Sequence, residues 1–114
     1  MNIKRGDIFL ASLDPVIGKE ISETRPVIIV SNDINNRYSD TVSVLPLTSK
    51  HVDRVYPFEV FLPKKPGNLP KDSKAKANQI RTIDKSRLVS FMGRIDAKYM
   101  SDIDQAMKVH LSLG

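Results

Sequence analysis

The spacing of apolar residues changes once along this chain, and that change limits the folds open to it. Up to about residue 95, apolar residues recur with a period of two in short segments, as in strands. Beyond that point the period becomes helical, with one apolar stripe formed by Met100, Ile103, Ala106, Met107 and Leu111. The sequence therefore predicts five or more short strands followed by one amphipathic helix.

Turn formers and prolines divide the first part of the chain into strand segments. Residues 6–15 alternate and stop at Pro15, and Val27–Val30 is a β-branched run typical of a strand covered on both faces. Pro46 predicts an edge strand or a bulge in its segment, and Gly93 predicts a break in the last one. Further strand patterns cover residues 41–49, 55–63, 73–84 and 87–95.

These elements favour a small, partly open antiparallel β-barrel with a helix packed on it, in the mainly β (α+β) class. Residues 32–40 predict one short helical turn between strands. Asp96 is expected to cap the final helix and Gly114 to stop it. Since no repeat or linker is present, residues 1–114 are expected to form a single domain.

Composition excludes several classes of protein. Among 114 residues there is no cysteine, which rules out disulfides, thiolate zinc sites and a cysteine nucleophile. No apolar stretch approaches the roughly 20 residues that span a bilayer, so a cytoplasmic protein without membrane contact is expected. A net charge of +5 permits binding to a polyanion but is also common on ordinary lysine-rich surfaces.

Motifs for metal, nucleotide or serine-hydrolase chemistry are missing: the chain has no HExxH, P-loop or GxGxxG and no carboxylates with metal-ligand spacing. No metal and no cofactor are therefore expected. His51 falls in a polar loop and His110 near the end of the final helix, so an acid–base pair is disfavoured.

Polar residues are concentrated at the predicted strand ends. Arg25, beside Pro26, opens the buried strand, Thr48 ends another, and residues 78–84 hold a dense polar group. Each alone is typical of caps and ion pairs. Together they indicate a site, because alternate strand ends of a small barrel meet at one rim.

Four segments resemble the MazF/PemK/Kid toxins of type II toxin–antitoxin systems, particularly the Gram-positive MazF branch. They are "RGDIFLASLDPVIGKEISETRPVIIVSND", "SVLPLTS", "YPFEVFL" and "ANQIRTIDKSRL", within a likeness that runs from Lys4 to Leu113. The resemblance implies an SH3-like barrel with a C-terminal helix and a homodimer. It also implies an mRNA interferase, an endoribonuclease that cuts single-stranded RNA at short sequences without a metal and is silenced by a cognate antitoxin with an acidic segment.

Metal-free RNA cleavage needs no protein nucleophile, because the substrate's own 2′-hydroxyl attacks the phosphorus, leaving 2′,3′-cyclic phosphate and 5′-hydroxyl ends. The protein must accept one proton, supply another and neutralise the phosphoryl oxygens. The resemblance implies that Arg25 and Thr48 are the catalytic pair. A guanidinium fork matches two phosphoryl oxygens, and Thr48 would donate to one of them.

The general base is open between Glu20, Glu23, Arg25 and water. Arginine has a pKa of about 12 or more and is a poor base, whereas Glu20 matches an acidic position that some relatives use. Asn78 stands where another branch has an aspartate, and an amide cannot accept the proton, so that branch's mechanism is not transferred.

Substrate binding is assigned to residues around this site. Asn78 and Gln79 suit hydrogen bonds to base edges. For Gln79 and Arg81 a structural network behind the rim is the alternative, evenly balanced with RNA contact for Arg81. Nonspecific attraction to phosphates is assigned to five lysines, Lys19, Lys50, Lys71, Lys74 and Lys76.

Two other functions fit the same fold. A toxin that inhibits gyrase would act through its C-terminal helix and would need no phosphate-binding rim. A non-catalytic barrel that binds RNA or a peptide would normally carry more aromatic residues than the 6% present here.

Overall fold

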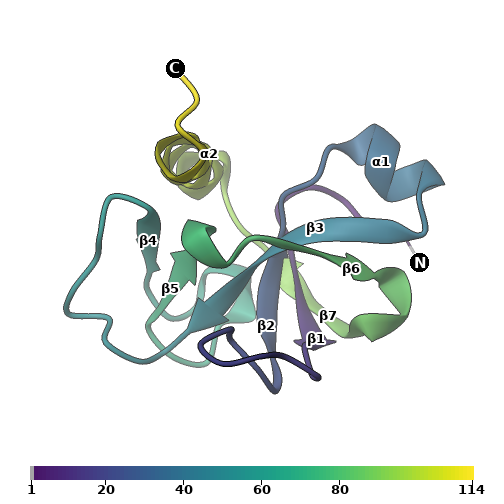
Figure 1. The fold of residues 1–114 in the computed structure, drawn as a ribbon, viewed down its shortest axis with the longest axis horizontal. Helices are drawn as coiled ribbons and strands as arrows, with labels where there is room; N and C mark the ends of the chain where they lie inside the picture. Colours follow the sequence, from purple (N-terminus) through teal and green to yellow (C-terminus); the bar gives the residue numbers. More distant parts are fainter. Residues whose placement is uncertain (1) are drawn as a thin grey trace.

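The computed structural model describes residues 2–114, a curved antiparallel sheet crossed by one long helix (Figure 1). In this part of the chain the strands are β1 (Asp7–Ser12), β2 (Thr24–Ile29), β3 (Thr41–Thr48), β4 (Glu59–Leu62), β5 (Ser73–Lys76), β6 (Arg81–Asp84) and β7 (Leu88–Arg94). The helices are α1 (Asp33–Tyr38) and α2 (Ala97–Leu111), with 3-10 turns η1 (Pro66–Asn68), η2 (Ala77–Gln79) and η3 (Lys85–Arg87).

The sheet has the strand order β4-β5-β3-β2-β1-β7, and β6 pairs with the first half of β3. Within residues 2–114 no pairing joins β4 to β7, so the barrel stays open at that seam. The predicted mainly β class with a C-terminal helix is confirmed, and so is the short helical turn, which is α1.

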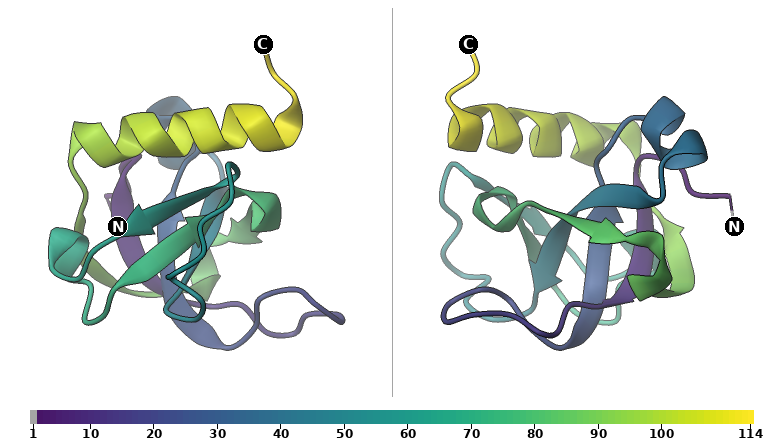
Figure 2. Two further views of the ribbon diagram at one scale, coloured as in Figure 1. Left: turned by 90° about the vertical axis from the view of Figure 1, so that its left-hand side faces the viewer. Right: turned by 45° about the vertical axis from the view of Figure 1, so that its right-hand side comes forward.

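Strand β2 separates two hydrophobic clusters. Val27, Ile28 and Ile29 are fully buried, as predicted for a strand covered on both faces. Ile28 belongs to the cluster that α2 closes with Ile103, whereas Val27 and Ile29 belong to the second cluster, which contains Phe9. Figure 2 shows α2 lying across the sheet above the first cluster. This double burial fixes β2 firmly, and with it the position of the strand's first residues.

Pro46 lies inside a central strand, so the prediction of an edge or a bulge is wrong. Strand β3 pairs with β2 on one side, where Pro46 is opposite Val27. On its other side β3 pairs with β6 as far as Val44 and with β5 from Leu47. Pro46 falls in the gap between those two ladders, where a missing N–H removes no bond from either.

The ends of several elements differ from the prediction. β4 covers only Glu59–Leu62, and η2 divides the segment 73–84 into two strands. Asp96 occupies the N-cap position of α2 as expected, but its side chain makes no capping hydrogen bond, and the C-cap is Ser112, in a left-handed conformation, rather than Gly114. Leu111 is 47% exposed, because the last turn of α2 extends past the sheet. No helix in residues 2–114 is long and apolar enough to cross a membrane.

Gly93 does not end β7, which continues to Arg94, but the register of β7 with β1 shifts beside it, between the pairs Ile8–Gly93 and Phe9–Phe91. A Cβ at Gly93 would lie 2.7 Å from the carbonyl carbon of Gly67, so the backbone of η1 approaches this strand too closely for any side chain. We expect Gly93→Ala to lower the free energy of unfolding by about 1–3 kcal/mol, the usual cost of overpacking. Urea denaturation measures it, with Gly114→Ala as the control because a Cβ there meets nothing within 4 Å. Equal stability of the two variants would contradict the close approach.

Candidate functional site

Arg25 and Thr48 lie on neighbouring strands, at the end of the sheet away from α2. In the ladder between β2 and β3, Val27 is opposite Pro46. This ladder ends at that pair; continued by two residues, its register would bring Arg25 opposite Thr48 on the same face of the sheet. Arg25 Nη1 lies 3.5 Å from the carbonyl oxygen of Leu47, the residue before Thr48, so the start of β2 and the end of β3 are close despite their separation in sequence.

The Arg25 guanidinium is half-buried and anchored on two sides. Its Nε donates to the carbonyl oxygen of Ser22 (2.7 Å), and Nη1 makes a longer contact with the carbonyl oxygen of Leu47 (3.5 Å). It lines a cavity of about 390 Å³, within the size range of small-ligand sites. The lining residues are Glu23, Thr24, Arg25, Pro26, Leu47, Ser49, Pro70, Lys71 and Ser73.

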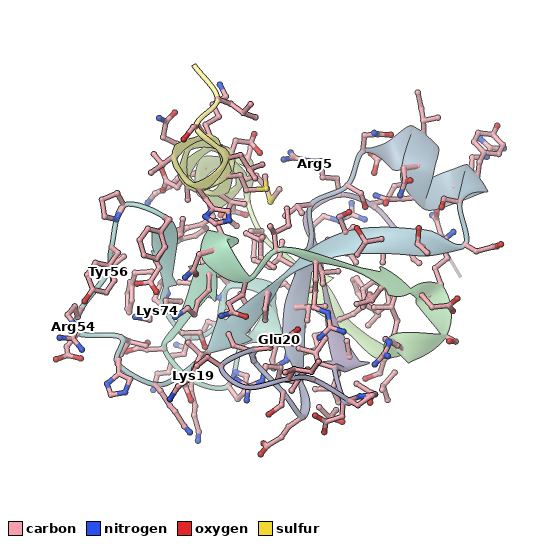
Figure 3. The ribbon with its side chains drawn as sticks, viewed as in Figure 1. Arg5, Lys19, Glu20, Arg54, Tyr56 and Lys74 are labelled. Carbon is pink, nitrogen blue, oxygen red and sulfur yellow. The ribbon has the colours of Figure 1, made fainter. Side chains whose placement is uncertain are left out.

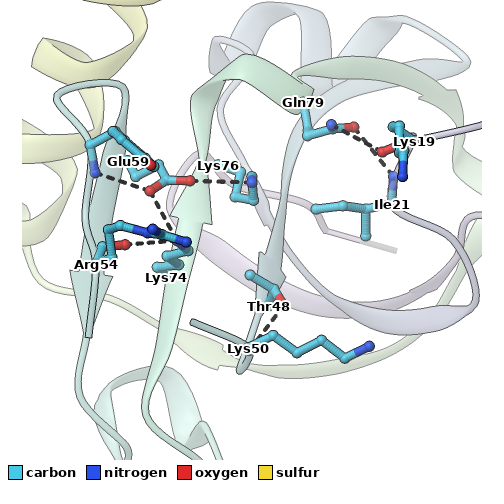
Figure 4. A network of polar contacts seen from close by, with 10 residues as sticks. Lys19, Ile21, Thr48, Lys50, Arg54, Glu59, Lys74, Lys76 and Gln79 are labelled. Atoms are coloured by element: carbon cyan, nitrogen blue, oxygen red, sulfur yellow. Dashed lines mark hydrogen bonds and ion pairs between the residues drawn. The ribbon is translucent and has the colours of Figure 1, made fainter. Parts of the chain in front are cut away.

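Thr48 does not itself line this cavity, although Leu47 and Ser49 on either side of it do. Its Oγ1 accepts the backbone N–H of Lys50 (3.2 Å), an interaction drawn in Figure 4. Because this bond uses a lone pair, the hydroxyl proton stays available for donation to an anion. The Lys50 side chain is exposed near the same edge.

The two candidate carboxylates occupy different places on the β1–β2 loop, residues 13–23. Glu20 is exposed, and its Oε1 accepts the backbone N–H of Ile17 (2.8 Å). Among residues 2–114, Glu23 is the carboxylate that lines the cavity with Arg25. Glu23 has φ of 71°, and its N–H donates to Asp14 Oδ1 (3.1 Å).

Gln79 and Arg81 bind the protein's own backbone, which is the structural alternative left open above. The Gln79 amide meets the N–H of Ile21 (3.3 Å) and the carbonyl oxygen of Lys19 (3.5 Å), as Figure 4 shows. Arg81 Nη1 donates to the carbonyl oxygen of Leu13 (3.1 Å). Asn78, by contrast, is exposed at the surface.

Lys74 cannot serve as a free surface charge, so that part of the phosphate-attraction prediction is wrong. Its ammonium is buried, 3.0 Å from Glu59 Oε1 and 2.8 Å from the carbonyl oxygen of Arg54. Lys76 pairs with Glu59 Oε2 at 3.2 Å. Figure 3 shows Lys74 and Arg54 on the β4–β5 side of the molecule, with Lys19 and Glu20 on the β1–β2 loop. Lys19, Lys50 and Lys71 remain exposed.

Glu59 was not singled out by its sequence, although a carboxylate inside the apolar run "YPFEVFL" is a usable signal. Burial acts to raise the pKa of Glu59, but hydrogen bonds from the Tyr56 N–H and from Lys74 and Lys76 outweigh it and lower the pKa below 4.5. The carboxylate therefore stays ionised and holds the β3–β4 connection against β5.

Arg87 was also missed, and nothing in its local sequence marks it. Its Nη1 donates to the carbonyl oxygens of Ser12 (3.2 Å) and Asp14 (2.5 Å). His51 and His110 lie on a loop and on the end of α2. Within residues 2–114, no group of three or more histidine or acidic side chains is placed to hold a metal ion.

An open antiparallel barrel with a C-terminal helix is the fold of several solved structures. MazF from Deinococcus radiodurans matches with a TM-score of 0.85 at 23% identity, over 99% of each chain. An endoribonuclease solved in complex with its cognate antitoxin from a mycobacterial species has a TM-score of 0.81 at 24% identity. That match covers 98% of this chain and 97% of the other.

Sequence comparison gives the family. Residues 4–111 match the PemK-like, MazF-like toxins of type II toxin–antitoxin systems. Endoribonuclease EndoA of Bacillus subtilis is 38% identical over 99% of this chain and 97% of its own. Endoribonuclease MazF9 of Mycobacterium tuberculosis is 39% identical over 97% and 98%. The chain belongs to this toxin family, as its motifs predicted, and the predicted enzyme class agrees with the names of both relatives.

Proposed function

We propose that this chain is the toxin of a type II toxin–antitoxin pair and a metal-independent endoribonuclease that cuts single-stranded RNA, including mRNA, at short sequences. Family membership and two endoribonuclease relatives that match over nearly their whole length support the class of activity. The observation that carries the proposal is a cavity of about 390 Å³ lined by Arg25 and by Leu47 and Ser49, the residues on either side of Thr48.

The chemistry follows from what these side chains can do. The substrate 2′-oxygen forms a bond to phosphorus while the bond from phosphorus to the 5′-oxygen breaks. The Arg25 fork pairs with the two non-bridging oxygens, and Thr48 donates to one of them, so both stabilise charge that grows in the transition state. The departing 5′-oxygen takes a proton from solvent water, so the products carry a 2′,3′-cyclic phosphate and a 5′-hydroxyl.

Glu20 is the proposed base that accepts the 2′-hydroxyl proton. Its one bond to the Ile17 N–H is exposed, so exchanging it for a substrate hydroxyl costs only about 1 kcal/mol. We expect Glu20→Gln to lower kcat by about 10²–10⁴-fold, and Glu23→Gln to change kcat by only a few-fold. The reverse order of the two variants would assign the base to Glu23, the carboxylate at the cavity.

Thr48→Ala should reduce kcat by about 10²–10³-fold, the cost of losing one donor to a developing oxyanion. KM should change little, because the ground-state phosphate keeps its contacts with Arg25 and the lysines. Single-turnover cleavage of a short RNA measures the step. Thr48→Ser keeps the hydroxyl and is the matched control; equal losses in both variants would refute a donor role.

The test of the whole proposal is to incubate the purified protein with long RNA and identify the product ends. We expect cleavage to continue in excess EDTA and to yield cyclic phosphate and 5′-hydroxyl ends. Loss of cleavage on chelation would mean that a metal takes part. Intact RNA together with inhibited gyrase would favour the gyrase-directed alternative, and binding of RNA without cleavage would favour the non-catalytic one.

Partners follow from the same proposal. A net charge of +5 suits both RNA and an antitoxin whose acidic segment covers the site. The mycobacterial endoribonuclease solved with its cognate antitoxin shares this fold, which supports an antitoxin partner. We propose that the chain acts as a homodimer in the cytoplasm, where mRNA is available.

A further inference from the structure

The β1–β2 loop connects two neighbouring strands and is held both by its own hydrogen bonds and by side chains from distant segments. Most of its residues are exposed, and Leu13 at its start is the one fully buried within residues 13–23. It projects on the side of the sheet away from α2 (Figure 2). Exposed loops of this length are mobile unless tied down. The Leu13 N–H donates to the carbonyl oxygen of Glu23 (3.1 Å) and closes the base of the loop. The other ties are side chains from η2, β6 and η3, between 58 and 75 residues further along the chain.

Two arginines hold the beginning of the loop. Arg81 donates to the carbonyl oxygen of Leu13, and Arg87 donates to those of Ser12 and Asp14. Asp14 in turn accepts the N–H of Glu23 through its carboxylate, which joins the start of the loop to its end. Hydrogen bonds from charged donors to carbonyl groups are among the stronger ones, so both arginines resist opening of the loop.

Gln79 holds the half of the loop that leads into β2, at Lys19 and Ile21 on either side of the candidate base Glu20. Its Oε1 accepts the N–H of Ile21, and its Nε2 approaches the carbonyl oxygen of Lys19 at 3.5 Å. The carbonyl oxygen of Ser22, the residue after Ile21, accepts Arg25 Nε at 2.7 Å. The orientation of the Arg25 guanidinium is therefore tied to the position of the loop, and Gln79 holds the peptide two positions earlier, between Glu20 and Ile21.

We infer that Gln79, Arg81 and Arg87 are positioning residues, a loop clamp that holds residues 13–23 and thereby aims the Arg25 guanidinium into its cavity. The inference rests on the proposed ribonuclease function. The clamp acts on the reaction only through Arg25 and the loop, and one guanidinium nitrogen of each arginine, Nη1, is bound to backbone carbonyls.

The alternative is that Arg81 and Arg87 contact RNA directly. The salt dependence of RNA binding distinguishes that role from holding the loop. An arginine that neutralises a phosphate contributes about one to the slope of log K against log salt, so its loss flattens that slope by about one. An arginine that only holds the loop leaves the slope as it is. Misplacement of Arg25 by about 1 Å would instead reduce kcat by up to about 10²-fold.

The experiment compares Arg87→Gln and Gln79→Leu with Arg37→Gln. Arg37 is exposed on α1, and its replacement removes the same charge as Arg87→Gln without touching the loop. For each full-length protein we would measure amide hydrogen exchange over residues 13–23, kcat and KM on a short RNA, and the salt slope of RNA binding. Arg87→Lys, which keeps one donor and the charge, tests rescue.

We expect faster exchange over residues 13–23 and a 10- to 100-fold lower kcat in Arg87→Gln and Gln79→Leu, with KM and salt slope as in Arg37→Gln. Arg87→Lys should recover part of the kcat. A flatter salt slope in Arg87→Gln with unchanged loop exchange would overturn the inference in favour of RNA contact. Faster exchange with unchanged kcat would overturn the link to Arg25. A wild-type protein that cuts no RNA would refute the proposed function instead, and exchange would still decide whether the clamp holds the loop.

Discussion

Replacement of Arg25 by alanine is expected to lower the rate of RNA cleavage by about 10³–10⁵-fold, the range found for arginines that stabilise phosphoryl-transfer transition states. Arg25 lines the cavity, and its planar fork matches two phosphoryl oxygens in a way that an ammonium or a hydroxyl does not. Single-turnover cleavage of a short RNA gives the rate, and thermal unfolding monitors the fold, because the variant also loses the Nε bond to Ser22.

Arg25→Lys is the matched control for that result. Lysine keeps the charge but loses the planar fork and the bond to the Ser22 carbonyl. We expect it to recover RNA binding and only a small part of kcat. An Arg25→Ala protein that is folded and fully active would remove the proposed mechanism, and full activity in Arg25→Lys would show that charge alone suffices.

Replacement of Lys74 by methionine should have the largest effect on stability. The Lys74 and Glu59 side chains are 5% and 1% exposed, and removing one member of a buried pair leaves the other charge uncompensated. We expect a loss of about 3 kcal/mol in the free energy of unfolding, the low end of the usual range, because Lys76 still pairs with Glu59. Urea denaturation at neutral pH measures the loss.

Lys76→Met is the control, since Lys76 binds the same carboxylate from a more exposed position, and it should cost less than about 1 kcal/mol. The contribution of Glu59 to the free energy of unfolding depends on pH in a definite direction. Because the pKa of Glu59 is lowered from 4.5 in the folded protein, its stabilisation is present above that pH and is lost as the pH falls below it. Equal losses in Lys74→Met and Lys76→Met would contradict the buried pair.

The sequence predicted those parts of the fold that depend on local pattern. The β-branched run Val27–Val30 indicated a strand buried on both faces, and residues 27–29 are fully buried. The helical stripe correctly placed Met100 and Ile103 against the sheet. Both patterns record which faces meet the core, and burial is the main force that selects the fold.

Contacts between distant segments were not predictable in the same way. Nothing near Lys74 signals burial, because its partner Glu59 comes from another strand. Gln79 and Arg81 were assigned to RNA with an alternative, since their types suit either base edges or backbone carbonyls. The choice depends on where the β1–β2 loop folds back, which only tertiary structure decides. Pro46 was misjudged because β3 changes partner at that residue.

The most direct test replaces one non-bridging oxygen at the cleaved phosphate with sulfur, as separate diastereomers, and compares cleavage rates. If Arg25 and Thr48 bind those oxygens, wild type should cut one diastereomer markedly more slowly than the all-oxygen RNA, and this ratio should fall towards one in Thr48→Ala and Arg25→Lys. The same ratio in wild type and both variants would mean that neither side chain contacts the scissile phosphate.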